Sequence, residues 1–164
     1  MSVVAYKDGV MASDSRGWAG RFKASPGRKR KLHRLRDGSL LGVSSGQVGM
    51  ADRFAAWMKR GGRLDDWHGR APDNLSAMRV MPNGDLYVIE DSLDWTGPMT
   101  GTRMYAIGSG GDFAIGAMMA GKSAVEAVRI ACQLDAYSAT PVFVLKKGKH
   151  HASGRGRWNR KGGR

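Results

Sequence analysis

The stretch SVVAYKDGVMASDSR, residues 2–16, decides how this chain begins to fold. Two short apolar runs flank Asp8-Gly9, and this dipeptide is the strongest short-range signal for a two-residue hairpin turn. Counting back from the turn brings Ser2 opposite Ser15, beside the carboxylate of Asp14. The segment therefore predicts a β-hairpin that carries a serine and an acidic residue at the end away from its turn.

The rest of the chain alternates between strand-like and helix-like segments. Apolar residues from Met50 onward recur at helical spacing, and Gly61-Gly62 ends this helix. Residues 63–74 are rich in turn-forming residues and too short for another long helix. The other expected strands cover residues 31–35, 39–45, 77–81, 86–90, 104–107 and 142–145, and the other expected helices cover about 112–120 and 123–134. This order predicts the α+β class.

Composition limits the possible classes of protein. The 164 residues fit one domain, and a hydrophobic content of 41% excludes a wholly disordered chain. Cys132 is the only cysteine, so an internal disulfide is excluded. No long apolar run or charged leader is present, which predicts a cytoplasmic protein without a membrane span. The polar motifs do not resemble a metal site, and no cofactor is implied.

The formal charge of +13 is concentrated at the C-terminal end. Residues 148–164 have no acidic residue and no apolar period, which predicts a flexible basic tail after a domain of residues 1–147. The tail is interpreted either as a solubilising end or as a contact for nucleic acid or another acidic partner. The candidate contact residues in it are Arg155, Arg157, Trp158, Arg160 and Lys161.

Ser2 suggests a particular chemistry if Met1 is removed. A serine at the N-terminus carries a hydroxyl nucleophile and a free α-amine, and such an amine can act as the base that activates the hydroxyl. Its ordinary pKa of roughly 7.7–8.0 lies close to neutral pH. A nearby cation such as Lys31 would lower this pKa and keep the amine neutral.

Three motifs, considered together, indicate a known family. They are ASDSR at residues 12–16, AIGSGG at 106–111 and DAYS at 135–138. In this order and spacing they resemble the proteasome β-type and HslV-type peptidases of the N-terminal nucleophile hydrolase superfamily, over residues 2–145. The resemblance implies a four-layer αββα sandwich.

The resemblance also implies roles for individual residues. Ser2 corresponds to the nucleophile, where the family usually has threonine, and Asp14 and Lys31 correspond to the charged pair beside it. Gly46 corresponds to the backbone N–H donor to the oxyanion, and Val48 to a wall of the specificity pocket. The residues that resemble the supporting hydrogen-bond network around the α-amine are Ser109, Asp135 and Ser138.

Two departures from the family pattern bear on these roles. A direct residue count places Met1 at the nucleophile position, whereas a hairpin shortened by an even number of residues keeps its register and favours Ser2. Residues 63–74 cannot supply the second long helix of one helical layer. We therefore expect that layer to be shortened, with apolar surface around Trp57 and Trp67 that contacts another subunit.

The sequence favours a peptidase that forms a homo-oligomeric ring, with an ATP-dependent unfoldase as a partner implied by the resemblance alone. Two alternatives stay open. One is a catalytically silent ring-forming scaffold, or a nucleic-acid-associated protein that uses the basic tail. The other is an amidase that applies the same N-terminal chemistry to a small substrate. Each site residue also has a structural interpretation, in which Asp14 ends a strand and Lys31 is a surface cation.

Overall fold

The computed structural model describes residues 2–17, 28–70 and 72–148. Its strands form two antiparallel sheets of four strands each, in the orders β7-β1-β2-β8 and β3-β4-β5-β6. The strands of the first sheet are β1 (Val4–Lys7), β2 (Val10–Ser13), β7 (Met104–Ile107) and β8 (Phe143–Lys146). Those of the second are β3 (Leu32–Arg34), β4 (Leu40–Ser45), β5 (Leu75–Val80) and β6 (Leu86–Glu90). The helices are α1 (Val48–Lys59), α2 (Gly111–Met119) and α3 (Ala124–Leu134), with a single 3₁₀ turn η1 (Leu64–Asp66).

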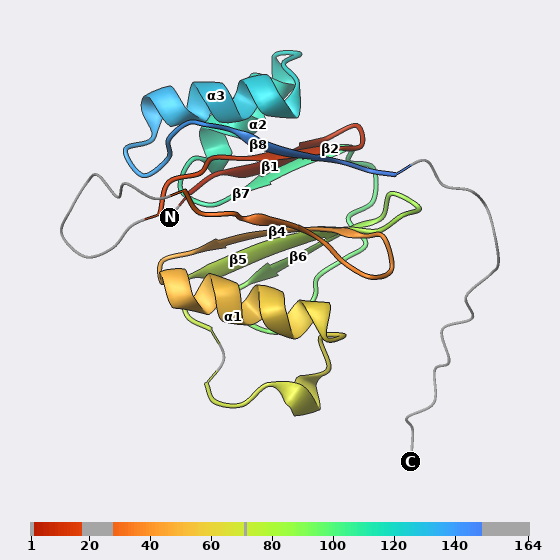
Figure 1. Cartoon of the computed structure of the whole chain (residues 1–164). Helices are drawn as coiled ribbons and strands as arrows, with labels where there is room; N and C mark the ends of the chain where they lie inside the picture. Colours follow the sequence, from red (N-terminus) through yellow and green to blue (C-terminus); the bar gives the residue numbers. More distant parts are fainter. Residues whose placement is uncertain (1, 18–27, 71, 149–164) are drawn as a thin grey trace.

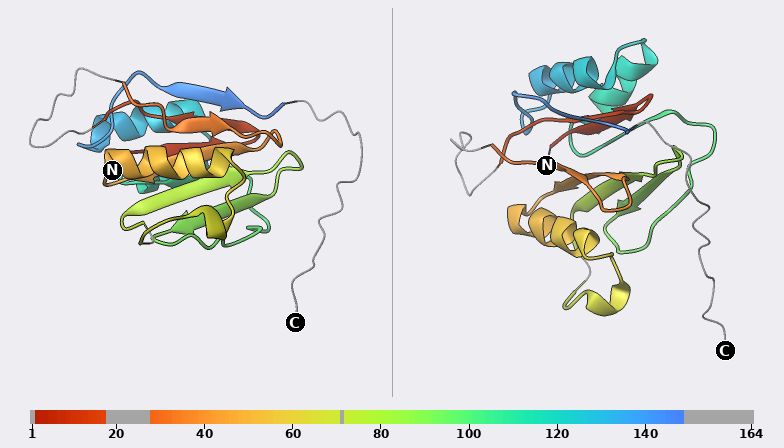
Figure 2. Two further views of the ribbon diagram at one scale, coloured as in Figure 1. Left: turned by 60° about the horizontal axis from the view of Figure 1, so that its bottom comes forward. Right: turned by 45° about the vertical axis from the view of Figure 1, so that its right-hand side comes forward.

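The two sheets face each other, and helices cover their outer faces (Figure 1). Helices α2 and α3 lie on the first sheet, and α1 lies on the second, as the turned views in Figure 2 also show. An apolar cluster fills each of three interfaces. One lies between the first sheet and α2 and α3, one lies between the two sheets, and one lies between the second sheet and α1. The alternation of side chains along a strand explains this division. In the first hairpin Val3 and Ala5 pack under α2 and α3, whereas Val4 and Tyr6 pack between the sheets.

The predicted hairpin is confirmed in its register. Lys7 pairs with Val10 and Val4 pairs with Ser13. Asp8 and Gly9 both have positive φ angles, 47° and 83°, which a two-residue turn of this kind requires. Pairing continues beyond the strands, since the Asp14 N–H donates to the carbonyl of Val3 at 3.1 Å. The hairpin therefore places its open end, with Ser2 and Asp14, at one edge of the sheet pair.

The other predicted elements are present, with boundaries that differ by a few residues. Helix α1 begins at Val48, before the first residue that shows helical spacing in the sequence, and β5 begins at Leu75 instead of residue 77. Residues 63–74 contain η1 and no α-helix among the positions that the structure describes. One sheet therefore has a single covering helix where the other has two.

The prediction of exposed apolar surface around Trp57 and Trp67 is wrong for Trp57 itself. Trp57 is 1% exposed, and its indole N–H donates to the carbonyl of Arg63 at 2.7 Å. The ring of Trp67 lies edge-on at 5.4 Å from Trp57, and the guanidinium of Arg53 lies over Trp67 at 4.4 Å. The segment after α1 thus folds back on the helix and covers Trp57 with an aromatic side chain. The exposed apolar side chain of this segment is Leu64 in η1, which is 58% exposed.

His33 in β3 makes stability sensitive to acid. Burial, helped by the positive charges of Lys59 and Arg30, lowers the pKa of His33 to about 4. Between the ordinary histidine value of about 6.5 and this value, the unfolded chain binds a proton that the folded chain does not. Stability contributed by neutral His33 is therefore present above pH 6.5 and is lost as the pH falls toward 4.

We expect His33→Gln to reduce this acid sensitivity. After a discount for the partial exposure of His33, the parent should lose about 1 kcal/mol more stability than the variant between pH 7 and pH 4.5, or about 3 °C in Tm. Thermal melts of the parent and variant proteins at pH 7 and pH 4.5 measure it. The drop in Tm between these pH values should be smaller in the variant, and equal drops would contradict the assignment.

Candidate active site

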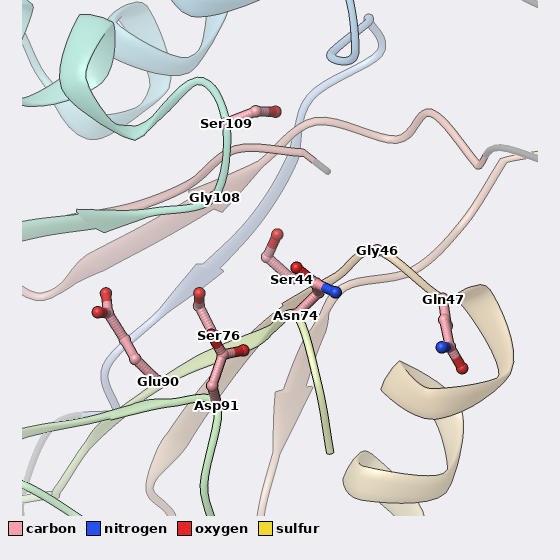
Figure 3. A pocket seen from close by; sticks show the side chains of 9 residues that line it. All are labelled: Ser44, Gly46, Gln47, Asn74, Ser76, Glu90, Asp91, Gly108 and Ser109. Carbon is pink, nitrogen blue, oxygen red and sulfur yellow. The ribbon is translucent and has the colours of Figure 1, made fainter.

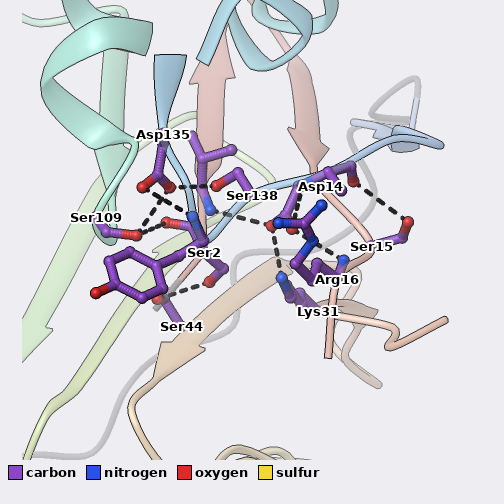
Figure 4. Close-up of polar contacts among 12 residues, drawn as sticks. Ser2, Asp14, Ser15, Arg16, Lys31, Ser44, Ser109, Asp135 and Ser138 are labelled. Atoms are coloured by element: carbon purple, nitrogen blue, oxygen red, sulfur yellow. Dashed lines mark hydrogen bonds and ion pairs between the residues drawn. The ribbon is translucent and has the colours of Figure 1, made fainter. Parts of the chain in front are cut away.

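The predicted nucleophile Ser2 lies just before β1 and is fully buried between the two sheets (Figure 4). Its side chain points to the same side of the hairpin as Val4, toward β4, because residues two apart share a face. The Ser2 hydroxyl donates to Oγ of Ser44 at 2.7 Å. The Ser2 carbonyl accepts from the N–H of Gly110 at 3.2 Å. Both the side chain and the backbone of Ser2 are thus fixed.

A buried ion pair lies beside Ser2. The ammonium of Lys31, 6% exposed, lies 2.5 Å from Oδ1 of Asp14, which is fully buried. Oδ1 also accepts the N–H of Val3 at 3.0 Å, and Oδ2 accepts the N–H groups of Arg16 at 2.9 Å and Ala139 at 3.3 Å. Burial lowers the pKa of Lys31, and the adjacent Asp14 opposes that shift. Lys31 is therefore no surface cation, and one carboxylate oxygen connects it to the residue that follows Ser2.

A second buried carboxylate lies on the other side of Ser2. Oδ2 of Asp135 accepts the hydroxyls of Ser138 at 2.6 Å and Ser109 at 2.9 Å, and Oδ1 accepts the N–H of Tyr137 at 3.2 Å. Asp135 follows the last residue of α3, where the helix dipole disfavours a negative charge. Three hydrogen-bond donors compensate for this position. Ser109 also reaches the carbonyl of Ser2 at 3.4 Å.

The approach of Ser109 to Ser2 depends on a glycine. Gly108 has a φ angle of +89°, and a Cβ atom built there would lie 2.2 Å from the carbonyl oxygen of Ser2. Only glycine combines that backbone conformation with so close a contact. The AIGSGG motif therefore ends β7, turns at residues 108–110 and begins α2, and its turn brings Ser109 against the start of β1.

The predicted oxyanion donor is already engaged in this structure. The N–H of Gly46 donates to the carbonyl of Asn74 at 2.8 Å, which extends the pairing of β4 with β5 by one residue. The role of Gly46 stays a prediction, and it requires this bond to be shared or exchanged when substrate binds. Val48 is the first residue of α1, and its predicted role as a pocket wall also stays a prediction. The predicted contact residues in the tail, beyond position 148, lie outside the described residues.

A pocket of about 550 Å³ adjoins Ser2 (Figure 3). Ser44 and Ser109, which both contact Ser2, belong to its lining. The other lining residues are Gly46, Gln47, Asn74, Ser76, Glu90, Asp91 and Gly108. The two serines thus connect a fully buried hydroxyl to a space that can hold a ligand.

Ser44 is the contact that sequence reasoning missed. It stands in a Ser-Ser-Gly stretch that has no distinguishing chemistry by itself. The signal that could have identified it is alternation along β4, which places Ser44 on the same face as Leu40, toward the first hairpin. Glu90 and Asp91 were also missed, because their approach to Ser44 depends on how β6 lies beside β5 and β4.

The described residues contain neither a candidate metal cluster nor a candidate membrane-spanning helix. Among the ranges that the structure describes, no three His, Cys, Asp or Glu side chains are grouped so that they could hold a metal ion. Within the same ranges, no helix has the length and apolar character needed to cross a bilayer.

Comparison with known proteins gives matches at the level of structure. No protein-family profile and no curated protein sequence matches the chain. Thiobacillus denitrificans BPH is similar in structure with a TM-score of 0.61 and 21% identity, over 92% of this chain and 100% of the other. The same protein in complex with epoxomicin gives a TM-score of 0.60 at 21% identity, over 90% of this chain and 100% of the other. Eukaryotic HslV from Trypanosoma brucei gives a TM-score of 0.58 at 22% identity, over 88% of this chain and 98% of the other. The chain therefore has the HslV-type fold that its three motifs indicate.

Proposed function

We propose that this chain is a proteasome-like peptidase, built as a four-layer αββα sandwich in which one helical layer is shortened, and that Ser2 is its nucleophile. The observation that carries the proposal is the position of Ser2 between two buried carboxylates. Asp14 with Lys31 holds one side of the residue, and Asp135 with Ser109 holds the other. Burying two charged networks beside one serine hydroxyl lowers the stability of the fold. A gain in stability therefore does not explain these networks, and this supports a catalytic role.

The proposed reaction begins once the bond between Met1 and Ser2 is cleaved. The free α-amine of Ser2 takes the proton of the Ser2 hydroxyl as its oxygen attacks the substrate carbonyl. The tetrahedral intermediate collapses to an ester on Ser2, and the amine returns the proton to the leaving nitrogen. Water, deprotonated by the same amine, then hydrolyses the ester and restores the hydroxyl. Every proton is thus exchanged among Ser2, its substrate and the hydrolytic water.

The two buried networks have different proposed parts in this reaction. The positive charge of Lys31 lowers the pKa of the α-amine and keeps it available as a base. Asp14 holds Lys31 and the backbone of Val3 with the same oxygen, so the charge and the start of β1 stay in fixed relation. Asp135, Ser109 and Ser138 provide acceptors and hydroxyls near the place where the amine is freed.

The assembly and the location of the protein also belong to the proposal. Similarity to HslV supports a homo-oligomeric ring, and we carry over an ATP-dependent unfoldase partner and a cytoplasmic location from the same resemblance. Sedimentation of the purified chain measures the ring. A monomer at micromolar concentration would contradict the oligomer and leave the chemistry at Ser2 to be judged separately.

We expect Ser44→Ala to reduce turnover about fivefold. The variant removes the hydroxyl that fixes the Ser2 oxygen at 2.7 Å, and one hydrogen bond contributes about 1 kcal/mol. Steady-state kinetics on one peptide substrate measure the effect, which should fall on kcat more than on KM. Ser45→Ala is the matched control, because alternation turns the adjacent side chain away from Ser2, and its kcat should match that of the parent. Equal kcat values for both variants and the parent would contradict the role of Ser44.

The experiment that tests the function combines substrates with an electrophile. Purified protein is given unstructured polypeptides and small amides, and separately epoxomicin, the compound in the T. denitrificans BPH complex. The proposal predicts hydrolysis of the polypeptides and loss of that activity with epoxomicin. Hydrolysis of small amides alone would indicate the amidase alternative. If the protein hydrolyses no substrate and the inhibitor does not attach, the silent scaffold is indicated.

A further inference from the structure

We propose that the pocket beside Ser2 selects peptide substrates that carry a positively charged side chain, lysine or arginine, near the bond to be cleaved. This inference rests on the proposed function, because it assigns the pocket to the substrate of Ser2. It goes further by naming what the pocket accepts. The residues that determine the selection are Glu90 and Asp91.

Polar side chains predominate in the described lining of the pocket. Two of its described residues are glycines, and the others carry hydroxyl, amide or carboxylate groups. Such a lining favours a polar or charged substrate group over a leucine or phenylalanine side chain, whose burial requires apolar neighbours. Its volume of about 550 Å³ lies within the usual range of ligand sites.

The charge of the pocket opposes that of the chain as a whole. The sequence has a formal charge of +13, yet the described residues that line the pocket include two carboxylates and no lysine or arginine. An acidic lining is therefore a local feature and does not follow from the composition. A pocket with two negative charges attracts a cation and repels an acidic side chain.

The two carboxylates differ in how firmly they are held. Asp91 is fixed by a pair of bonds to Leu75, since its N–H donates to the Leu75 carbonyl at 2.9 Å and its Oδ1 accepts the Leu75 N–H at 3.0 Å. Glu90, the last residue of β6, has no hydrogen bond or ion pair from its side chain within the described part of the chain. Its carboxylate lies close enough to Tyr105 to raise the pKa of that phenol, after the larger effect of burial. Glu90 is thus a carboxylate on the pocket wall with its acceptor oxygens available.

The position of these carboxylates relative to Ser2 makes the selection relevant to cleavage. Glu90 pairs with Ser76 across β6 and β5, and Ser44 pairs with Ser76 across β4 and β5. One row across the sheet therefore runs from Glu90 through Ser76 to Ser44, which contacts the Ser2 hydroxyl. Figure 3 shows these side chains around the same space. A substrate side chain that extends along this row would place its backbone beside Ser2 and its charge beside Glu90.

The test is a panel of peptides that differ only in the residues nearest the cleaved bond, with arginine, lysine, glutamine, leucine or glutamate at each position in turn. The inference predicts that kcat/KM is highest for arginine or lysine at one position, by up to ~5-fold over leucine, because Glu90 and Asp91 are exposed and an exposed ion pair contributes at most about 1 kcal/mol. Glutamate at that position should be the poorest substrate.

Variants of the pocket connect the preference to its residues. Glu90→Gln keeps the shape of the side chain, and it should lower kcat/KM for the arginine peptide ~3- to 5-fold while leaving the leucine peptide unchanged. Glu90→Lys should move the preference toward glutamate. Asp85→Asn is the matched control, because Asp85 lies at the turn of the β5–β6 hairpin and Glu90 lies at its opposite end. The Asp85→Asn variant should have the same peptide preference as the parent.

The outcomes separate this inference from the proposed function. Peptide cleavage without a basic preference, or a basic preference that survives Glu90→Gln, overturns the inference and leaves the peptidase intact. A second measurement does not need catalysis: fluorescence anisotropy of the arginine and leucine peptides with the Ser2→Ala variant. Tighter binding of the arginine peptide that is lost in Ser2→Ala/Glu90→Gln supports the pocket assignment even if cleavage fails. Equal binding of the two peptides overturns it.

Discussion

Replacing Ser2 with alanine should remove peptide hydrolysis almost completely while the fold survives. The variant deletes the attacking oxygen, and loss of a serine nucleophile lowers turnover by at least ~10⁴-fold in hydrolases that form an acyl intermediate. The structural cost is small, because one hydrogen bond of 2.7 Å to Ser44 is lost at a price of about 1 kcal/mol. Single-turnover kinetics and a thermal melt measure the two effects separately.

Ser13→Ala is the control for this variant. Ser13 is fully buried in the same hairpin, and its hydroxyl has no hydrogen-bond partner among the described residues. The same chemical change there should leave turnover at the parent value, and stability should stay equal or rise because an unsatisfied hydroxyl is removed. Full activity of Ser2→Ala would contradict the nucleophile assignment.

Lys31→Met should destabilise the protein strongly and impair turnover as well. The variant leaves the fully buried carboxylate of Asp14 without its cation, and breaking a buried pair in this way costs about 3–5 kcal/mol. For a chain of this size that corresponds to a drop of roughly 10 °C in Tm. At temperatures where the variant is folded, loss of the charge beside the α-amine should lower turnover at least ~10²-fold.

Lys29 provides the matched control for Lys31. It also forms an ion pair, with Asp52; the Lys29 side chain is 18% exposed and that of Asp52 is 63% exposed. Lys29→Met should cost less stability than Lys31→Met, because the carboxylate of Asp52 keeps its contact with water when the cation is removed, and it should leave turnover unchanged. Similar melting temperatures for the two variants would contradict the predicted contribution of the Lys31–Asp14 pair to stability.

The sequence was sufficient to predict the parts of the fold that depend on short-range patterns. Asp8-Gly9 sets the turn of the first hairpin, and period-2 alternation then sets the register that brings Ser2 and Asp14 together. The motif around Gly108 could be placed as a turn, and the structure shows it against the start of β1. The burial of Lys31 beside Asp14 followed from the resemblance, since a lysine in a cluster of basic residues gives no local signal of burial.

Features that depend on how distant segments pack could not be predicted in the same way. Trp57 was expected at an exposed face, but the chain after α1 returns and places Trp67 against it. Engagement of the Gly46 N–H by Asn74 depends on how far β5 extends beside β4. The pocket at Glu90 combines residues from β4, β5, β6 and the turn after β7, and no local pattern relates these four segments.

The most direct test is the mass of the N-terminal peptide in the active protein. The protein is allowed to react with an electrophile that inhibits N-terminal nucleophile hydrolases, digested, and analysed by mass spectrometry together with untreated protein. The untreated peptide should begin at Ser2, and the treated peptide should carry the inhibitor on Ser2, with no adduct in Ser2→Ala. Active protein in which Met1 is uniformly retained, or an adduct on any other residue, would contradict Ser2 as the nucleophile.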